Sequence, residues 1–438
     1  MNNLTTSIGN TAQPAHAGTQ FAASGFTRFD RWLRSLVIRH FRQLHDARLV
    51  LQDGIGTVEL GTGNADLRVR VQVTNPAFYR AVIASGSVGA GEAYMAGDWR
   101  CDDLVSLVRL LVRSRNLLDG MEKGWARLGG WLLRSGQHLR RNTLEGSRRN
   151  ISAHYDLGNE FFALFLSPDL MYSSAYWMPE DDTLASASTR KLDLICRKLQ
   201  LSADDHVIEI GTGWGGFALH AATHYGARVT TTTISREQHA LASERVAQAG
   251  LSDRVTVLLE DYRALNGQYD KLVSIEMIEA IGAEYLDTYF GQLGRLLKPD
   301  GLALLQAITI EDQRYAQALK SVDFIKHHVF PGSFIPSIQA MLTAKTHSSD
   351  LALVHLEDFG HSYARTLKAW RERFLAQLDE VRKLKFDERF IRLWEFYLAY
   401  CEGGFRERSI GVAHLLLAKP GFRGAGPYAA DSKPALPA

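Results

Sequence analysis

A strand that ends in a glycine-rich loop and continues into a helix constrains the fold of this chain most strongly. Residues 206–210, HVIEI, have the apolar, β-branched character of a buried strand, and residues 217–226 have the pattern of a helix. Four glycines fill the loop between them: Gly211, Gly213, Gly215 and Gly216. Glycine suits this loop because a left-handed turn disfavours a Cβ atom and because a ligand must approach the backbone closely.

The spacing of these glycines, G-x-G-x-G-G, differs from the dinucleotide-binding pattern G-x-G-x-x-G. Glu209 also precedes the loop directly, whereas a dinucleotide site has its acidic residue about 20 residues later. A carboxylate at the end of the strand could instead face a positively charged ligand, so we interpret the loop as a pocket for an adenosyl sulfonium compound. A tight strand-to-helix connection that binds no ligand is the alternative.

Strand-like and helix-like stretches alternate from about residue 186 onwards. This order predicts a parallel sheet with helices on both faces, closed by an antiparallel strand near the end of the chain. The expected strands cover residues 206–210, 227–235, 254–261, 270–276, 301–310, 351–359 and 409–419. Pro299 and Gly301 are expected to end the helix before the fifth strand, after Lys298. The predicted fold class is α/β, with a doubly wound, Rossmann-like sheet.

The sequence divides into five parts. Residues 1–25 are poor in large apolar side chains and are expected to form a disordered tail. Residues 26–115 combine an amphipathic helix with alternating strands, which predicts a small α+β domain. Residues 116–150 mix tryptophans with lysines and arginines, which suits a membrane-facing segment; a basic, solvated interdomain linker is the alternative. Residues 151–420 hold the large sheet, and residues 421–438 are expected to be a flexible tail.

Composition and charge exclude several classes of protein. A net charge of +2 gives no global signal for nucleic-acid binding. The three cysteines lack metal-ligand spacing, which predicts a reducing compartment and no metal site. No apolar stretch reaches the roughly 18 residues that span a membrane, and no secretory signal is recognised. We therefore expect a cytoplasmic protein.

Side chains that follow the strands should surround the ligand, because ligands of open α/β sheets bind beyond the carboxyl ends of the strands. These positions are Gly211, Thr212, Gly213, Trp214, Thr233, Ser235, Gln238, Asp261, Tyr262, Arg263, Glu276, Glu279 and Gln306. Asp261 could accept a hydrogen bond from an adenine amino group, and Gln238 could hold ribose hydroxyls. The alternative for each single position is an exposed loop residue or a helix cap, although so many ligand-capable groups together favour a binding site.

Residues 151–177 are rich in aromatic rings and come just before the predicted sheet. Aromatic faces suit an apolar acyl chain, and they also stabilise a cation in a site that excludes water. We therefore expect this segment to form a lid over the ligand. The alternative is a pair of aromatic helices that covers the sheet as part of the core.

Seven motifs occur in the order of a known family. They are HYDLGNEFF, MYSSAYW, IEIGTGWGG, TISREQ, EMIEAIG, FPGSFIPS and YCEGGF, and together they closely resemble the cyclopropane-fatty-acyl-phospholipid synthases over about residues 30–420. The resemblance implies a class I methyltransferase that uses S-adenosylmethionine to form a cyclopropane at the cis double bond of unsaturated phospholipid chains. It also implies a cytoplasmic enzyme that associates peripherally with the inner membrane face. The oligomeric state stays open, with a homodimer as one option.

The same resemblance assigns residues to the S-adenosylmethionine site. They are Tyr172, Ser173, Glu209, Gly211, Thr212, Gly213, Trp214, Gly215, Gly216, Thr233, Ile234, Ser235, Gln238, Asp261 and Tyr262. Methylation of an alkene creates a carbocation, so the site must exclude water and present aromatic faces. The candidates for these faces are Tyr155, Tyr172, Tyr176, Trp177 and Phe330, whereas His154 is expected to be structural.

The family is thought to remove the proton with a bound bicarbonate held by a cysteine, a glutamate, a histidine and a tyrosine. Glu279 and Tyr363 match the glutamate and the tyrosine, but Ser174 and Gln306 replace the cysteine and the histidine. Both replacements can donate hydrogen bonds, so the anion site could persist. Glu276 stands where well-known members have glycine, and its carboxylate could act as the base itself or could repel the anion.

Cys401 matches a cysteine once regarded as the family's active-site thiol. It lies in a stretch with the pattern of an amphipathic helix. Because a carbocation mechanism needs no thiolate, we expect Cys401 to form part of the pocket wall rather than to act as a nucleophile.

Three rival functions stay open. Loss of a chain proton instead of a methyl proton would give a methylene- or methyl-branched lipid, and the changes at Ser174, Gln306 and Glu276 leave this outcome open. A lipid-binding protein that keeps the fold without catalysis is the second, although the intact IEIGTGWGG and EMIEAIG motifs argue against it. A soluble small-molecule methyltransferase is the third.

Overall fold

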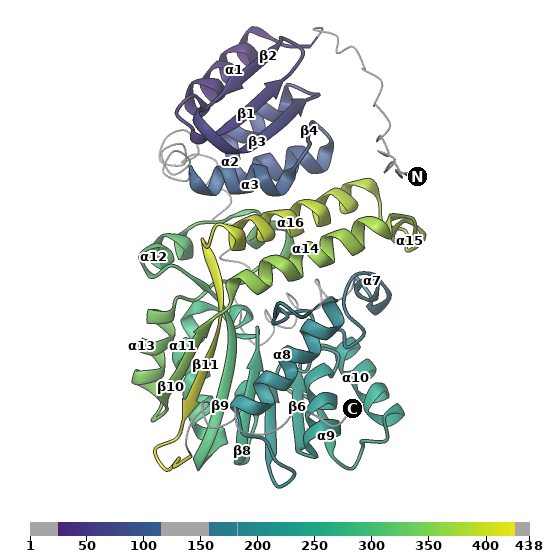
Figure 1. Ribbon diagram of the computed structural model, residues 1–438, viewed down its shortest axis with the longest axis vertical. Helices are drawn as coiled ribbons and strands as arrows, with labels where there is room; N and C mark the ends of the chain where they lie inside the picture. The colour runs from purple at the N-terminus through teal and green to yellow at the C-terminus, as the bar shows by residue number, and fades with distance from the viewer. Residues whose placement is uncertain (1–24, 115–156, 182, 425–438) are drawn as a thin grey trace, which may run out of the picture.

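The computed structural model describes residues 25–114, 157–181 and 183–424. Two units lie along the long axis of the molecule, with the smaller, N-terminal unit at the top of Figure 1 and the large sheet at the bottom. Helices α14 (Gly360–Ala376) and α16 (Glu388–Arg406) form a layer between them. Several predictions fall outside the described residues. They concern the two tails up to residue 24 and from residue 425, the basic segment, and His154 and Tyr155.

The N-terminal unit is a four-stranded sheet packed against three helices. Its strand order is β2-β1-β3-β4, in which β1 and β3 are parallel and the other pairs are antiparallel. The elements are α1 (Arg28–Phe41), β1 (His45–Gln52), β2 (Thr57–Leu60), β3 (Thr62–Val73), α2 (Ala77–Ala96), β4 (Trp99–Cys101) and α3 (Leu104–Arg113). The sequence pattern does not predict β4, because three residues are too few to show an alternation.

The large unit contains a seven-stranded sheet of order β10-β11-β9-β8-β5-β6-β7. Strands β5 to β9 are parallel, and β11 and β10 extend the sheet beyond β9 as antiparallel strands. The strands are β5 (His206–Ile210), β6 (Arg228–Thr233), β7 (Val255–Leu259), β8 (Tyr269–Ile275), β9 (Leu297–Ile310), β10 (Ala352–Asp358) and β11 (Ile410–Ala418). This arrangement confirms the predicted doubly wound α/β class.

Helices cover both faces of this sheet. They are α8 (Leu184–Lys198), α9 (Gly216–Tyr225), α10 (Arg236–Gln248), α11 (Leu286–Leu296) and α13 (Ile338–Ser348). The remaining short helices of the unit are α7 (Asn159–Ala163), α12 (Asp312–Lys320) and α15 (Leu378–Lys383). Alternate residues of β9 serve the two faces, because side chains of a strand alternate in direction. Leu302 and Leu304 belong to the core with α8 and α9, whereas Ala303 and Leu305 belong to the core with α11 and α13.

The aromatic segment before the sheet is core rather than a lid. Phe161, Phe162 and Phe165 are fully buried. The Phe161 ring centroid lies 4.9 Å from that of Trp394 in α16, in an edge-to-face arrangement. The prediction of a lid is therefore wrong for these rings. The physical reason is that the layer formed by α14 and α16 covers the segment, which sequence periodicity alone does not reveal.

The predicted end of the helix before the fifth strand is also wrong. Helix α11 ends at Leu296, and β9 begins at Leu297, so Pro299 lies inside a strand. The pairing of β9 with β8 shifts register between Tyr269 and Lys271, opposite this proline. Proline is tolerated at such an irregularity because its missing N–H removes no regular ladder hydrogen bond.

Close packing of α16 against α3 holds the two units together. A Cβ atom at Gly403 would lie 2.6 Å from Cγ1 of Val108.

We expect Gly403→Ala to lower the free energy of unfolding by about 1–3 kcal/mol through overpacking, as measured by denaturant unfolding. The control is Gly404→Ala, whose Cβ would come no closer than 3.3 Å to any atom, at the Ile410 side chain. Equal losses of stability in the two variants would contradict this packing argument.

Candidate active site

One cavity of about 870 Å³ extends from the carboxyl ends of the parallel strands into the N-terminal unit. Most of the predicted site residues line it. They are Tyr172, Ser173, Glu209, Gly211, Thr212, Gly213, Trp214, Thr233, Ile234, Gln238, Asp261, Tyr262, Glu276, Glu279, Tyr363 and Cys401. Sixteen residues that are scattered over the sequence therefore meet around one space. Its far end is apolar and includes Leu36 of α1, Leu107 of α3 and Val82 of α2.

Five residues predicted for the cofactor site or the anion site do not line the cavity but support its wall. Ser235 is the N-cap of α10, and its hydroxyl accepts a hydrogen bond from the backbone N–H of Gln238 at 3.2 Å. Gly215 precedes α9 directly, and a Cβ atom at Gly216 would lie 2.6 Å from the sulfur of Met171. Ser174 and Gln306 are buried behind Glu276.

The glycine loop adopts the backbone conformation that its sequence predicts. Gly211, Gly213 and Gly215 have φ values of +104°, +52° and +83°, which side chains other than glycine rarely adopt. The N–H groups of Gly211 and Thr212 both donate to the carbonyl of Thr232, at 3.1 and 3.0 Å. The loop is thereby tied to the end of β6, and its open side faces the cavity.

Glu209 at the end of β5 is a buried carboxyl group with an incomplete set of partners. Burial raises its pKa to about 8, and its Oε2 atom has no hydrogen-bond partner among the described residues. A buried polar atom of this kind is costly unless a ligand completes it. The cationic sulfonium group predicted from the sequence fits this position chemically.

Lys191 is a charged residue of this site that the sequence interpretation missed. It is fully buried in α8, and its ammonium group donates to the hydroxyl of Ser173 at 2.9 Å. Burial lowers its pKa to about 8, against the attraction of Asp169, Glu276 and Glu209. A signal was available, because Lys191 is spaced by a helical turn from the apolar residues that α8 buries.

Two polar residues predicted to contact the adenosyl group are held by neighbours. Both carboxylate oxygens of Asp261 accept hydrogen bonds from the Arg263 guanidinium, at 2.8 and 2.7 Å. Oε1 of Gln238 accepts from the hydroxyl of Thr233 at 2.8 Å. These contacts fix both side chains at the cavity wall.

Glu276 occupies the centre of the site. The backbone N–H of Ser174 and the side-chain amide of Gln306 donate to its Oε1, at 2.9 and 2.8 Å, and the hydroxyl of Tyr363 donates to its Oε2 at 2.7 Å. Three of the four residues that the resemblance assigns to a bicarbonate ion therefore hold this carboxylate. Burial raises the pKa of Glu276, and the three donors oppose that effect.

Two details of the structure bear on the predicted anion site. The hydroxyl of Tyr363 donates to Glu276, because the Glu276 side chain lies between the donors. The hydroxyl of Ser174 donates to the carbonyl of Ala175, so its backbone N–H and not its hydroxyl faces the carboxylate. The φ angle of Glu276 is +49°, a left-handed value that suits glycine and aims the side chain into the site.

Glu279 is the second carboxyl group near this centre. Its Oε1 accepts from the backbone N–H of Ile308 at 2.5 Å, and its Oε2 has no partner among the described residues. Burial and the charge of Glu276 raise its pKa to about 8. Two neighbouring buried carboxylates do not both ionise readily. Glu276 has the donors, so it is the member of this pair that ionises more readily, while Glu279 holds its proton more strongly.

A buried network fixes the orientation of Gln306. Nδ1 of His414 lies 3.0 Å from the ammonium group of Lys198, which also pairs with Glu357. Burial keeps the pKa of His414 well below its usual value, so the ring is neutral and its Nδ1 accepts from Lys198. Nε2 of His414 then carries the hydrogen and donates to Oε1 of Gln306 at 3.0 Å. The NH2 group of Gln306 consequently points at Glu276.

The predicted aromatic faces divide into two groups. Tyr172 and Phe330 line the cavity, with ring centroids 6.4 Å apart. Tyr176 and Trp177 do not, because Tyr176 bonds to Glu357 and the Trp177 N–H donates to Thr366. Their prediction as cation-facing rings is wrong, since these hydrogen bonds direct both side chains elsewhere.

Cys401 lies in α16 and lines the cavity. Burial raises the pKa of its thiol, so the group stays protonated at neutral pH. A protonated thiol is a poor nucleophile, because the thiolate is the reactive form. Its position therefore suits the predicted role as part of the pocket wall.

The doubly wound sheet and the glycine loop at its strand ends define a class I S-adenosylmethionine-dependent methyltransferase. The family model for mycolic acid cyclopropane synthetase matches residues 142–415, more than half of the chain. The protein belongs to this family of lipid methyltransferases.

Two curated relatives match most of the chain. The tuberculostearic acid methyltransferase UfaA1 of Mycobacterium tuberculosis is 38% identical over 385 residues, which cover 85% of this chain and 88% of that protein. The cyclopropane-fatty-acyl-phospholipid synthase of Escherichia coli K12 is 38% identical over 361 residues, which cover 82% and 89%. The cyclopropane synthase MmaA2 from Mycobacterium tuberculosis has a similar structure, with a TM-score of 0.58, 30% identity and coverage of 62% of this chain and 98% of that one.

The ionisation of Glu209 generates a prediction for cofactor binding. We expect the affinity for S-adenosylmethionine to rise as the pH rises through about 8, because the cation favours the ionised carboxylate. Glu209→Gln should weaken binding and flatten this pH dependence. Isothermal titration calorimetry between about pH 6 and pH 9 measures both effects. S-adenosylhomocysteine, which carries no sulfonium charge, is the control ligand and should show the smaller dependence. A variant that keeps the full pH dependence would contradict the assignment.

Proposed function

We propose that this protein transfers a methyl group from S-adenosylmethionine to the cis double bond of an unsaturated phospholipid chain and forms a cyclopropane there. The observation that carries the proposal is a buried, donor-held carboxylate, Glu276, at the junction between the glycine loop and an apolar cavity. An alkene is a weak nucleophile and reacts only with a strong electrophile. The cation that results survives only where water is excluded.

The residues have complementary roles in this reaction. S-adenosylmethionine supplies an electrophilic methyl group when it is bound. The alkene's π electrons would form the new carbon–carbon bond while the methyl–sulfur bond breaks and its electron pair stays on sulfur. This would leave a cation on the neighbouring chain carbon. The faces of Tyr172 and Phe330 stabilise this cation. Glu276 then takes a proton from the new methyl group, and the released electron pair closes the ring, so the chain gains one CH2 group.

Glu276 is proposed as the proton acceptor in place of a bicarbonate ion. Its carboxylate already uses the donors Ser174, Gln306 and Tyr363, which would otherwise be available to that anion. A second anion beside it would also meet like-charge repulsion in a buried site. Protonated Glu279 lies next to this base and adds no competing charge.

Substitution of Glu276 tests this role. Glu276→Gln should lower the rate by about 10²–10⁴-fold, because it removes a positioned base. Glu276→Gly should also be slow, but added bicarbonate should restore part of its rate, since the smaller residue leaves the three donors to the anion. Initial rates of methyl transfer with and without bicarbonate measure this, and S-adenosylmethionine affinity serves as the control for folding. A Glu276→Gln enzyme with normal rates would contradict the assignment.

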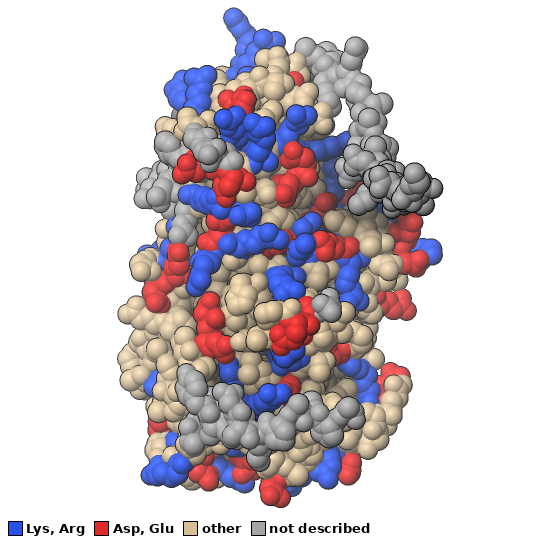
Figure 2. Space-filling model, viewed as in Figure 1, with Lys and Arg blue, Asp and Glu red and all other residues tan. Residues whose placement is uncertain are grey.

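Helix α1 is proposed to face the lipid surface. Its inner side contributes Leu36 and Phe41 to the cavity, while Phe29 and Trp32 on its outer side are 57% and 44% exposed. Arg28, Arg31, Arg39 and Arg42 are exposed on the same helix, and its one acidic residue, Asp30, is buried. Figure 2 shows basic side chains at the upper end of the molecule, where Figure 1 places α1. Exposed rings flanked by arginines suit an anionic membrane surface.

No helix in the described part of the chain is both long and apolar enough to cross a membrane. The proposed docking through α1 generates its own prediction. Replacement of Phe29 and Trp32 by serine should weaken vesicle binding at least tenfold, because each buried aromatic ring contributes about 1.5–3 kcal/mol. Co-sedimentation with vesicles that contain phosphatidylglycerol measures the effect. The control variant carries serine at Leu353 and Leu356, two exposed apolar residues of β10. Equal losses in both variants would contradict docking through α1.

A methylene-branched product is the second candidate. The relative named as a tuberculostearic acid methyltransferase matches this chain at the same identity as the cyclopropane synthase and over more residues. A hydride shift along the chain before the proton leaves the methyl group would give this product from the same cation. Conversion to a saturated methyl branch would then require a separate reductase that supplies two electrons.

Product analysis distinguishes the candidates. The protein is incubated with trideuteromethyl S-adenosylmethionine and vesicles of a monounsaturated phospholipid. A cyclopropane or a methylene group retains two of the deuterons, whereas loss of a chain proton retains all three. Proton NMR of the unlabelled product then separates high-field ring signals from olefinic methylene signals. No label in lipid would contradict the proposed substrate, and a label in a soluble acceptor would favour the small-molecule rival.

A further inference from the structure

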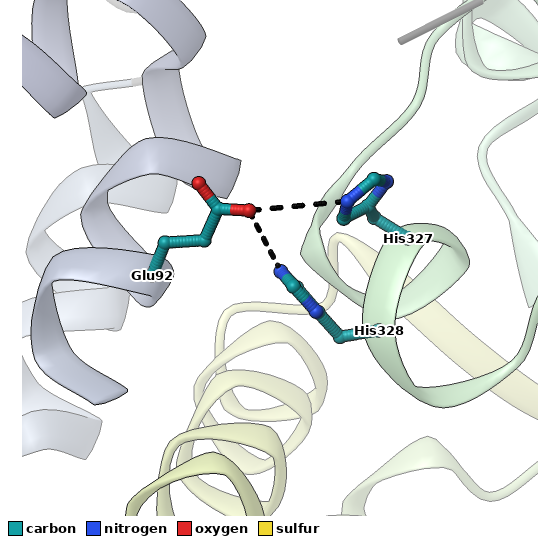
Figure 3. A group of neighbouring side chains, drawn as sticks. All are labelled: Glu92, His327 and His328. Atoms are coloured by element: carbon teal, nitrogen blue, oxygen red, sulfur yellow. Dashed lines mark ion pairs between the residues drawn. The ribbon is translucent and has the colours of Figure 1, made fainter. Parts of the chain in front are cut away.

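Three side chains with metal-binding groups meet where the N-terminal unit touches the large unit. Glu92 comes from α2, and His327 and His328 come from η4, a π-helical turn at Ile325–Val329 (Figure 3). In residues 25–114, 157–181 and 183–424, this is the group of His, Cys, Asp and Glu side chains whose ligand atoms all lie within 4.8 Å of one another. The proposed methyl transfer does not use these three side chains.

The geometry of this group resembles that of a metal site. The Nε2 atoms of His328 and His327 lie 3.3 and 3.9 Å from the same oxygen of Glu92. Two ligands at about 2.0–2.1 Å from a tetrahedral Zn²⁺ ion are about 3.3 Å apart, so only a small side-chain movement is needed to close the group around an ion. The imidazole rings are perpendicular, at 89°, and both direct a nitrogen toward Glu92 (Figure 3).

We propose that Glu92, His327 and His328 form a binding site for a divalent transition-metal ion, with Zn²⁺ as the favoured ion. Two imidazole nitrogens and one carboxylate oxygen are a common ligand set for zinc sites that keep a fourth position for water. Mg²⁺ and Ca²⁺ prefer oxygen ligands and fit this set less well. Side-chain exposures of 42% for Glu92, 29% for His327 and 16% for His328 give an ion and its water access from solvent.

A bound metal ion would hold α2 and η4 together more strongly than these three side chains do by themselves. A partly exposed ion pair between Glu92 and these two histidines contributes little stability by itself. The contact between the two elements is nevertheless close, because a Cβ atom at Gly91 would lie 2.2 Å from the ring of Phe324. Helix α2 and η4 thus already lie close enough to share an ion.

The bound ion would connect two walls of the substrate cavity. Ile325 and Lys326 of η4 line this cavity, Phe330 follows directly, and Ala90 of α2 lines it from the other unit. A metal bridge would hold these walls at a fixed separation. This effect on the lipid-binding space rests on the proposed function, whereas metal binding itself does not.

Metal binding is tested on the full-length protein after treatment with a chelator. Isothermal titration calorimetry with ZnCl2 should show one ion bound per chain at micromolar or tighter Kd, together with a higher unfolding temperature. Glu92→Gln, His327→Gln and His328→Gln should each weaken binding at least tenfold. The control is His361→Gln, an exposed histidine of α14, which should bind as the unchanged protein does. Titration with Co²⁺ should give the visible absorption of a low-coordinate site, and the same three variants should lose it.

Unfolding temperatures without metal show whether each variant is folded. The proposal is overturned if the unchanged protein shows no saturable Zn²⁺ binding, or if binding survives in all three variants. It is also overturned if His361→Gln weakens binding as much as they do, because the ion then binds elsewhere. None of these readouts depends on methyl transfer, so a failure of the proposed lipid activity leaves this test intact.

Discussion

A carboxylate that is shielded from water depends on the hydrogen-bond donors fixed around it. Glu276 has such donors, from a backbone N–H, a glutamine amide and a tyrosine hydroxyl. Each donor belongs to a different part of the chain, so this set of donors surrounds the carboxylate only in the folded protein. The His414 network, which turns the Gln306 amide toward Glu276, shows that this arrangement extends beyond the atoms in direct contact. Removal of any one donor would leave a buried charge only partly compensated.

Charge balance in the rest of the site follows from the same constraint. Glu209 and Glu279 have pKa values of about 8 because burial disfavours their charged forms. Lys191 is the buried cation among them, and its pKa is lowered to about 8. Groups whose pKa values lie this close to neutral pH gain or lose protons when a charged ligand binds. Under the proposed mechanism, cofactor binding and proton removal would therefore be electrostatically linked through these few side chains.

The sequence predicts the sheet, the glycine loop and most of the cavity wall, because these depend on local periodicity and on the order of strands. It does not predict how side chains orient across elements. The donors around Glu276 were each identified, but their convergence on that carboxylate requires the left-handed backbone at Glu276 and the packing of α14. Lys191 was missed because a lysine in an amphipathic helix is usually solvated. The aromatic lid was mispredicted because its cover comes from α16, far away in the sequence.

The central claim is that the protein carries its own base. The most direct test is the initial rate of methyl transfer to vesicles in buffer freed of carbon dioxide, measured before and after bicarbonate is added to the unchanged enzyme. The account predicts the same rate in both conditions, because Glu276 already occupies the donors that an anion would need. A rate that collapses without bicarbonate and recovers with it would contradict the account, and it would assign proton removal to an exchangeable ion instead.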